Sequence, residues 1–259
     1  MLEWAAAFAA LEAIALLAVL GWALSVVRRD ASIVDSLWSL FFLLGTLVYT
    51  GMVVATGPRV VLLLALLAIW ALRLSGYLTW RNWGEPEDRR YQAIRARNEP
   101  GFAWKSLYLV FGLQAVLAWI IAMPLFAAIS GAAPLNALDF VGIGLWMFGF
   151  AFETIADWQL ARFKADPANR GKVLDTGLWR YTRHPNYFGE TVLWWGFFFI
   201  ALAAGGAWTV FAPLLMTILL LKVSGVALLE QDIGERRPDY RNYVVRTNAF
   251  IPWRPKEVA

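Results

Sequence analysis

Apolar residues run along this chain in long segments that short polar stretches interrupt. A helix needs about 20 predominantly apolar residues to cross a bilayer. Segments of that kind lie at about 3–27, 33–55, 59–80, 102–129, 137–161, 186–204 and 207–230. The pattern predicts an all-α polytopic membrane protein of about seven transmembrane helices, folded as a single domain over 1–259. The first segment lacks the basic start and cleavage site of a signal peptide, so we expect it to be a retained span.

Composition supports a membrane protein and excludes several chemistries. Of 259 residues, 60% are hydrophobic and 16% are charged, and the mean hydropathy is +0.56. Soluble domains carry roughly a quarter charged residues. The chain has no cysteine and one histidine, so disulfides and thiolate chemistry are excluded and a metal site is not expected.

The distribution of positive charge predicts the orientation of the spans. Of the 23 Lys and Arg, 20 lie in or beside loops that fall on one face of the membrane, and the opposite face keeps only Arg59. Basic residues accumulate on the cytoplasmic side, so we expect the N-terminus outside and the C-terminus in the cytosol. The formal charge of +4 then reflects this bias, and a nucleic-acid partner is not expected. The lipid bilayer is the expected environment, and the alanine-rich composition favours a bacterial inner membrane.

Several ionisable residues interrupt the apolar segments. They are Arg73, Glu153, Asp157, Glu190 and Lys222, with Asp35 at the entrance to the second span. A charge at bilayer depth costs about 2.5–3.5 kcal/mol on insertion scales and usually faces a cavity or a partner. These residues gather near the cytosolic ends of their spans, which predicts a common polar cavity that opens to the cytosol. Interhelical ion pairs that hold the bundle together are the simpler alternative.

Helical spacing places polar residues on shared faces. Three sets recur at intervals near one or more turns: Glu153, Asp157 and Lys164; Asn186, Glu190 and Trp194; Arg73, Tyr77 and Arg81. At 100° per residue each set stays on one side of its helix. We therefore expect these three faces to line the predicted cavity.

The segment "DTGLWRYTRHPNYFGE" carries dense polar chemistry at the start of a predicted helix. Pro185 suits the first helical turn, and a helix N-terminus beside Arg180 and Arg183 favours an anion. The preceding loop adds Lys164, Arg170 and Lys172, so a phosphate-bearing cofactor fits there. We interpret His184 as structural or phosphate-contacting in preference to a catalytic base.

The same segment, with the tail "LKVSGVALLEQDIGERRPDYRNYVVRTNAFIPW", resembles the C-terminal half of the steroid 5α-reductase family. "RRDASIVDSLW" and "WALRLSGYLTWRNWGEPEDRRY" are similar to the N-terminal half of its bacterial members. Looser "RHPxYxG" segments occur in isoprenylcysteine carboxyl methyltransferases, which bind S-adenosylmethionine in a comparable place. Asn186 together with Glu190 favours the reductase family.

This resemblance implies a seven-helix bundle that holds NADPH from the cytosolic side, without a Rossmann domain. Residues 1–101 would carry the substrate-side residues, and 102–259 most of the cofactor site. Lys164 and Lys172 stand where the family has arginines for the 2′-phosphate, and Glu153 replaces an Asn. The cofactor-binding residues it implies are Arg73, Tyr77, Arg81, Asn82, Glu153, Asp157, Lys164, Lys172, Arg183, His184, Asn186, Tyr187, Glu190, Trp194, Lys222 and Glu230.

The implied reaction reduces a carbon–carbon double bond conjugated to a ketone, in a lipid-soluble, steroid-like substrate. A protein donor must stabilise the carbonyl oxygen as negative charge builds on it. Asp35 matches the family's acid and would have to be protonated or share a proton; burial favours that state. Trp70 replaces the family's tyrosine, and an indole N–H donates a hydrogen bond but relays no proton. Tyr77 lies nearby on the same predicted helix.

Two other functions compete with this one. The first is an S-adenosylmethionine-dependent membrane methyltransferase. The second is a non-enzymatic transporter or lipid-binding bundle, which predicts polar residues through the whole depth of the membrane. The oligomeric state and the true substrate stay open at the level of the sequence.

Overall fold

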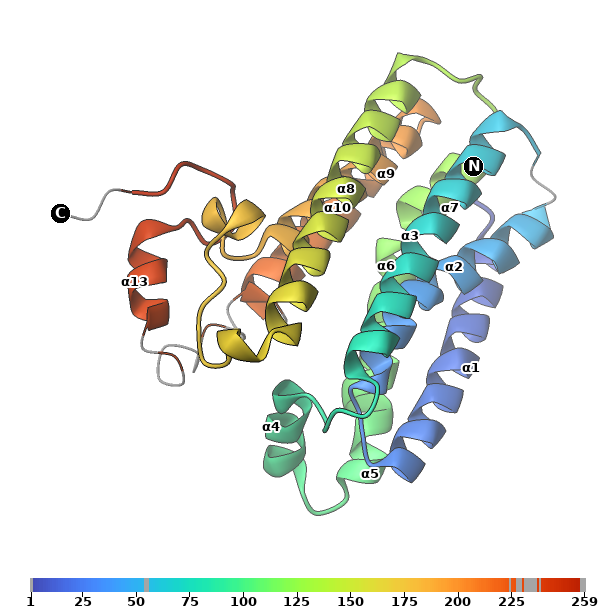
Figure 1. Ribbon diagram of the computed structural model, residues 1–259. Helices are drawn as coiled ribbons and strands as arrows, with labels where there is room; N and C mark the ends of the chain where they lie inside the picture. Colours follow the sequence, from blue (N-terminus) through green and yellow to red (C-terminus); the bar gives the residue numbers. More distant parts are fainter. Residues whose placement is uncertain are drawn as a thin grey trace. The chain divides into compact units, whose positions relative to one another are not determined.

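The computed structural model of the chain describes residues 2–53, 56–223, 225, 226, 230, 237 and 239–256. Within these ranges the regular structure is entirely helical, with no β-strand (Figure 1). The predicted all-α fold class is confirmed. The internal contacts divide the chain into two compact units: Met1–Asp139 with Ile200–Ala212, and Phe140–Phe199 with Pro213–Ala259.

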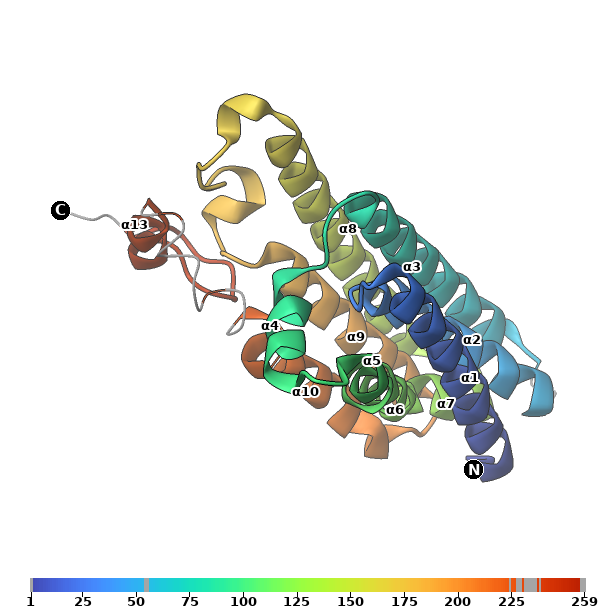
Figure 2. The ribbon, with the colours of Figure 1, turned by 90° about the horizontal axis from the view of Figure 1, so that it is seen from below.

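The first unit is a group of long antiparallel helices. Helix α1 packs against α2, α2 packs against α3, and α6 contacts both α1 and α2 (Figure 2). Its helices are α1 (Trp4–Arg28), α2 (Ile33–Val53), α3 (Pro58–Asn82), α4 (Arg89–Asn98), α5 (Phe102–Ser106), α6 (Leu113–Ile121) and α7 (Met123–Ser130). The short helix α4 lies between the predicted third and fourth spans, where the sequence has a charged loop.

Helices α5 to α7 form one apolar segment, Phe102–Ser130, that is long enough to cross a membrane. A π-helical stretch, Leu107–Gly112, joins α5 to α6. Pro124 stands in the first turn of α7, where a proline without an N–H breaks the regular hydrogen bonding of the helix. The predicted fourth span is therefore present as one interrupted helix.

The second unit is built on α8 (Ala137–Ala165, from Phe140 onward), α9 (Pro185–Ala203, as far as Phe199), α10 (Phe211–Ile218, from Pro213 onward) and α13 (Asp239–Arg246). A π-helical stretch, Leu219–Val223, continues α10. Helices α8 and α9 approach to backbone contact at two levels. A Cβ added to Gly196 would lie 2.7 Å from the carbonyl oxygen of Gly142, and one added to Gly189 would lie 2.5 Å from the amide nitrogen of Glu153. Small residues allow such close packing of membrane helices.

Among the residues that the structure describes, five helices meet the length and composition of membrane spans: Trp4–Arg28, Ile33–Val53, Pro58–Asn82, Phe102–Ser130 and Ala137–Ala165. Helix α9 forms where the sixth span is predicted, but its polar first turns, with Asn186 and Glu190, reduce its apolar character. The last apolar helix, Ala207–Val223, is short. The sixth and seventh spans and the orientation of the termini stay predictions.

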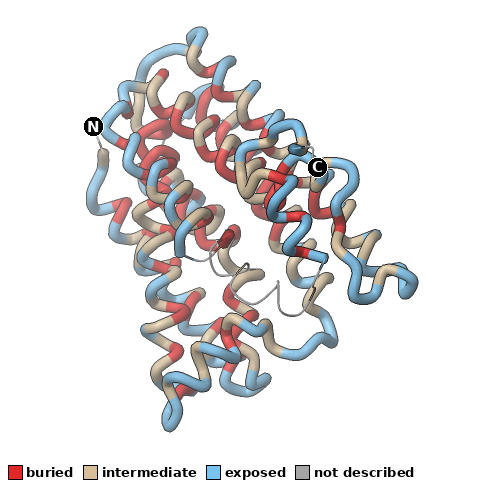
Figure 3. The backbone as a smooth tube through the Cα atoms, turned by 90° about the vertical axis from the view of Figure 1, so that its left-hand side faces the viewer, coloured by how far each residue is buried: buried red, intermediate tan, exposed pale blue. Residues whose placement is uncertain are grey.

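Large apolar side chains cover the outer faces of the helices. Val27, Leu72 and Met147 are 80%, 60% and 60% exposed, and buried and exposed positions alternate along the long helices (Figure 3). Helices of a soluble protein carry polar residues on the exposed side. The exposed apolar faces and the long apolar helices identify an integral membrane protein.

A buried ion pair closes the end of the first unit that lies opposite α4. The guanidinium of Arg59, at the start of α3, donates to both carboxylate oxygens of Asp139 at 2.8 Å and to the carbonyl oxygens of Ala133 and Pro134. Both side chains are at most 5% exposed. The pair is fully hydrogen-bonded, which is the condition under which a buried ion pair is tolerated.

Candidate functional site

Polar side chains are buried on both helices where α8 and α9 touch in the second unit. Because Gly149 and Gly189 bring the two backbones together, Asp157 on α8 lies beside Asn186 on α9, with 3.3 Å between Asp157 Oδ1 and Asn186 Nδ2. Glu153, Asp157 and Glu190 are 2%, 5% and 7% exposed. The structure thus brings together two of the polar faces that the sequence spacing indicates.

The remaining predicted residues of this unit surround that contact at different depths. Trp194 is fully buried one turn below Glu190 and packs edge-on against Phe197. The ring of Tyr187 lies parallel to that of His184, with 5.7 Å between the centroids. Lys164, in the last turn of α8, and Lys172, in the following loop, are exposed. Lys222, in the π-helical stretch, is exposed as well.

Arg183 and His184 hold the C-terminal tail. The Arg183 guanidinium donates to both carboxylate oxygens of Glu230, at 2.7 and 2.9 Å, and to the carbonyl oxygens of Val244 and Thr247. His184 Nε2 hydrogen-bonds Glu230 Oε1 at 2.9 Å. These contacts fix the loop before α9 against the tail. A direct contact of either residue with a cofactor stays a prediction.

Glu230 is ionised in this cluster. Burial by itself would raise its pKa, but hydrogen bonds from His184 and Arg183, with the charge of Arg183, lower the pKa to about 2. Tyr240 of the tail donates its hydroxyl to the same carboxylate at 3.0 Å. Burial and the charge of Glu230 raise the pKa of Tyr240 well above its usual value, so this phenol keeps its proton.

A second polar cluster lies in the first unit, around Asp35. Its Oδ2 accepts a hydrogen bond from Arg90 at 2.6 Å, and its Oδ1 accepts one from the hydroxyl of Tyr91 at 2.5 Å. Gln114, from α6, donates to that same hydroxyl at 3.1 Å. Asp88 caps α4 by accepting from the backbone N–H of Arg90. Helix α4 therefore folds back over the start of α2 and covers Asp35.

The charges of this cluster keep Tyr91 protonated. Burial raises the pKa of Tyr91 well above its usual value, and the negative charge of Asp35 raises it further. Asp35 accepts from both neighbours, and the charge of Asp35 raises the pKa of Arg90. The sequence predicts that Asp35 is protonated or shares a proton with a neighbour. The Tyr91 hydroxyl donates to Asp35 Oδ1, and the catalytic role of Asp35 stays a prediction.

The other predicted residues of the first unit lie along α3. Trp70 is fully buried, and its ring packs against that of Phe42 with 5.8 Å between centroids. The Arg81 guanidinium lies over the ring of Tyr77 at 5.8 Å, and its Nε donates to the side chain of Asn82 at 3.0 Å. Arg73 is half-buried one turn before Tyr77. A cavity shared by residues of both units stays a prediction.

Arg90, Tyr91, Gln114 and Tyr240 are not among the site residues that the sequence predicts. Arg90 and Tyr91 lie in the segment "WALRLSGYLTWRNWGEPEDRRY" that carries the family resemblance, but the resemblance assigns them no role. Asp88 stands directly before a run of good helix formers, which is the sequence pattern of an N-cap. This pattern predicts a helix at the position of α4. Within the described ranges, no group of three or more His, Asp or Glu is arranged to hold a metal ion.

Comparison with known proteins places the chain in a family. The chain is 27% identical over 266 residues to the uncharacterized protein C594.04c of Schizosaccharomyces pombe. The match covers 89% of this chain and 75% of the yeast protein. No solved structure matches the chain significantly. A family model described as "Protein of unknown function (DUF1295)" matches residues 21–247, which include both polar clusters. The chain therefore belongs to the DUF1295 family.

Proposed function

We propose that this protein is an integral membrane reductase that uses NADPH to reduce the carbon–carbon double bond of a lipid-soluble enone, such as a 3-oxo-4-ene steroid. The observation that carries the proposal is the close contact between α8 and α9, at which Glu153, Asp157 and Glu190 are buried and Asp157 lies beside Asn186, in a unit whose loop between these helices carries exposed basic residues. The DUF1295 family includes steroid 5α-reductase-like proteins, which supports the same reading.

The residues of this contact fit a nicotinamide better than a phosphate. Carboxylates repel a phosphate but accept hydrogen bonds from a carboxamide N–H₂ group, and their charge favours the cationic ring of the oxidised cofactor. Asn186 supplies both a donor and an acceptor for the same amide. Glu153, Asp157 and Glu190 are therefore the groups that would orient the redox ring.

The exposed basic residues of the loop after α8 fit the phosphates. Lys164, Arg170 and Lys172 are exposed between the end of α8 and the start of α9. A 2′-phosphate bound by two lysines distinguishes NADPH from NADH, because NADH lacks that group. The loop is held in place by the tail, since Arg237 donates to the carbonyl oxygen of Lys172 at 2.9 Å.

When bound, NADPH supplies the hydride that the β carbon of the enone receives. In the first unit, Tyr91 is the residue that can stabilise the carbonyl oxygen. Its hydroxyl is a protonated phenol held between Asp35 and Gln114. Burial and the charge of Asp35 raise the pKa of Tyr91, so Tyr91 would keep its proton and stabilise the oxygen as a hydrogen-bond donor, by turning its O–H from Asp35 to the substrate.

Selective loss of NADPH binding tests the cofactor part of the proposal. The double change Lys164→Ala and Lys172→Ala removes two charged partners of the 2′-phosphate. A hydrogen bond to a charged group is worth about 1.5–3 kcal/mol, so the Kd for NADPH should rise by about tenfold or more. The Kd for NADH should stay within about twofold. Cofactor fluorescence titration of the purified protein in detergent measures both constants.

The matched control is Lys105→Ala with Lys256→Ala, which removes the same charge from other places in the chain. It should leave both dissociation constants unchanged. An equal loss of NADPH and NADH affinity in the Lys164 and Lys172 variant would reject the assignment of the 2′-phosphate. Folded protein that binds neither nucleotide would reject the reductase function altogether.

A further inference from the structure

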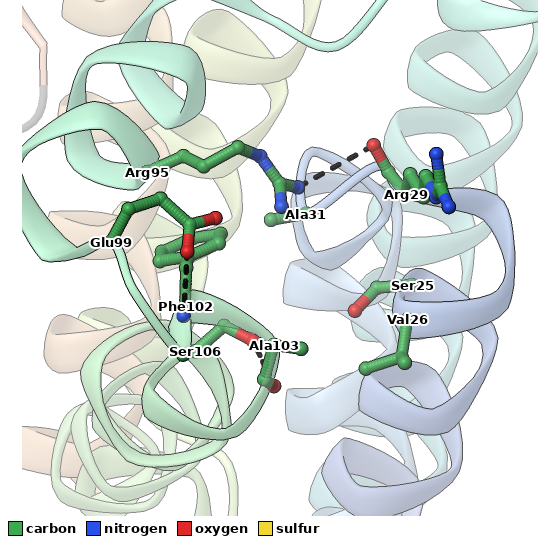
Figure 4. Close-up of a pocket in the computed structure, with 10 residues that line it drawn as sticks. Ser25, Val26, Arg29, Ala31, Arg95, Glu99, Phe102, Ala103 and Ser106 are labelled. Atoms are coloured by element: carbon green, nitrogen blue, oxygen red, sulfur yellow. Dashed lines mark hydrogen bonds between the residues drawn. The ribbon is translucent and has the colours of Figure 1, made fainter.

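The first unit contains a pocket that the proposed reductase chemistry does not use. It lies between the C-terminal end of α1 with the following loop, and the junction of α4 and α5 (Figure 4), and its volume is about 510 Å³. It is lined by Ser25, Val26, Arg29 and Ala31 on one side and by Arg95, Glu99, Gly101, Phe102, Ala103 and Ser106 on the other.

The pocket lies at the ends of two predicted membrane spans. Helix α1 ends at Arg28, and the apolar segment of α5 to α7 begins at Phe102. The rings of Trp22 and Trp104 lie tilted against each other, with 5.3 Å between their centroids, and Trp22 Nε1 donates to the carbonyl oxygen of Ala103, a residue that lines the pocket, at 2.7 Å. Tryptophan is enriched at the level of the lipid head groups. The mouth of the pocket therefore lies where head groups are found.

Of the charged side chains that line the pocket, one is paired with a residue outside it, and one positive and one negative side chain remain. Arg95 is neutralised by Glu87, to which it donates at 2.8 and 2.9 Å, and its guanidinium lies over the ring of Phe102. Figure 4 shows Arg95 reaching toward the carbonyl oxygen of Arg29, 3.4 Å away. Arg95 therefore lines the pocket with a side chain whose charge and hydrogen bonds are already satisfied within the protein. The remaining charges are the guanidinium of Arg29 and the carboxylate of Glu99, whose Oε2 accepts from the backbone N–H of Phe102 at 3.5 Å (Figure 4).

The floor of the pocket is rich in hydrogen-bond acceptors. The buried hydroxyls of Ser25 and Ser106 donate to the carbonyl oxygens of Trp22 and Ala103, at 2.8 and 2.9 Å. Their lone pairs are then the groups offered to a ligand. With the carboxylate of Glu99, they favour a ligand that carries several N–H donors and a positive charge.

The backbone of Arg29 gives an independent indication that its side chain has a role. Its φ is +54°, and among the described residues it is the non-glycine residue with a positive φ. Glycine is the usual residue after the end of a helix in this conformation, since it adopts it without a steric penalty. An arginine at this position retains an exposed cation beside the pocket, with its side chain directed away from Arg95 and Glu99 (Figure 4), at the cost of a strained backbone.

We propose that this pocket binds the head group of a zwitterionic phospholipid with a primary ammonium, of the phosphatidylethanolamine type. The ammonium donates to Glu99 and to the serine oxygens, and the phosphate lies at Arg29. The acyl chains run along the apolar surfaces of α1 and the Phe102–Ser130 segment. The site belongs to the first unit alone and does not depend on the proposed reductase function.

Lipid binding to the delipidated full chain in detergent, followed by native mass spectrometry, tests this site. We expect phosphatidylethanolamine to bind at least about tenfold more tightly than phosphatidylcholine, whose quaternary ammonium has no N–H to donate. Glu99→Gln should abolish that preference. Arg29→Gly should lower the affinity for phosphatidylethanolamine at least about fivefold. The stability of this variant should be no lower than that of the parent, because glycine relieves the backbone strain.

The matched control is Arg97→Ala, which removes an exposed arginine of α4 that does not line the pocket. It should bind lipid like the parent. Equal binding of phosphatidylethanolamine and phosphatidylcholine, or a preference for phosphatidylglycerol, would overturn the proposed head group. Displacement of the lipid by inorganic phosphate alone would show a simple anion site. NADPH titration of the same variants should be unchanged, which separates this site from the cofactor site.

Discussion

The close contact of α8 and α9 gives the sharpest test of the candidate cofactor site, through the change Gly189→Ala. A Cβ at this position would lie 2.5 Å from the amide nitrogen of Glu153 and 2.7 Å from the carbonyl oxygen of Gly149. These atoms belong to the backbone, so no side chain can rotate away. The two helices must separate, and Asn186 must move relative to Asp157.

The size of the effect follows from comparison with Gly144→Ala. Gly144 is also a helical glycine of this unit, but a Cβ there meets nothing within 4 Å. The gain in helix propensity from glycine to alanine, about 1 kcal/mol, is common to both changes. The difference between the variants is then the cost of overpacking, about 1–3 kcal/mol, and the rigidity of the contact places it in the upper half of that range.

Two measurements check this prediction. Unfolding of both variants in mixed micelles gives the difference in stability, and titration with NADPH gives the change in affinity. We expect the affinity of Gly189→Ala to fall by about tenfold, the value of one hydrogen bond to a charged group, and that of Gly144→Ala to stay at the parental level. A Gly189→Ala protein as stable as Gly144→Ala, with parental NADPH affinity, would refute the role of the helix contact.

Two further predictions concern the other clusters. Tyr91→Phe removes the hydroxyl held by Asp35 and Gln114, so enone reduction at saturating NADPH should fall by about 10²–10³ through loss of a hydrogen-bond donor to the carbonyl oxygen, with unchanged Kd for NADPH. Tyr108→Phe, at a tyrosine that is 62% exposed, is the control, and an equal loss in both variants would argue against Tyr91. The lowered pKa of Glu230, about 2 against an ordinary 4.5, means that its contribution to stability is complete above about pH 5 and is lost as the pH falls toward 2. Unfolding midpoints measured from pH 6 to pH 3 should therefore fall in the parent and change less in Glu230→Gln, and parallel curves would contradict the role of this carboxylate.

The sequence by itself determines where most of the helices lie. The predicted spans 3–27, 33–55 and 59–80 agree within two or three residues with α1, α2 and α3. A run of about 20 apolar residues has few alternatives in a membrane, because every backbone polar group must be satisfied inside the segment. The same reasoning places 102–129 and 137–161 correctly. It also places the polar residues of α8 and α9 on the correct helices, since their spacing follows the helical period.

The partners of those polar residues are decided only by the tertiary structure. Tyr91 reaches Asp35 across 56 positions of sequence, and Arg183 reaches Glu230 across 47. Helical periodicity reports which side of one helix is polar, but not which other segment covers it. The covering segments here are α4 and the tail, both rich in charge and without an apolar signal. Their positions follow from long-range hydrogen bonds and ion pairs, whose geometry exists only once the helices have packed.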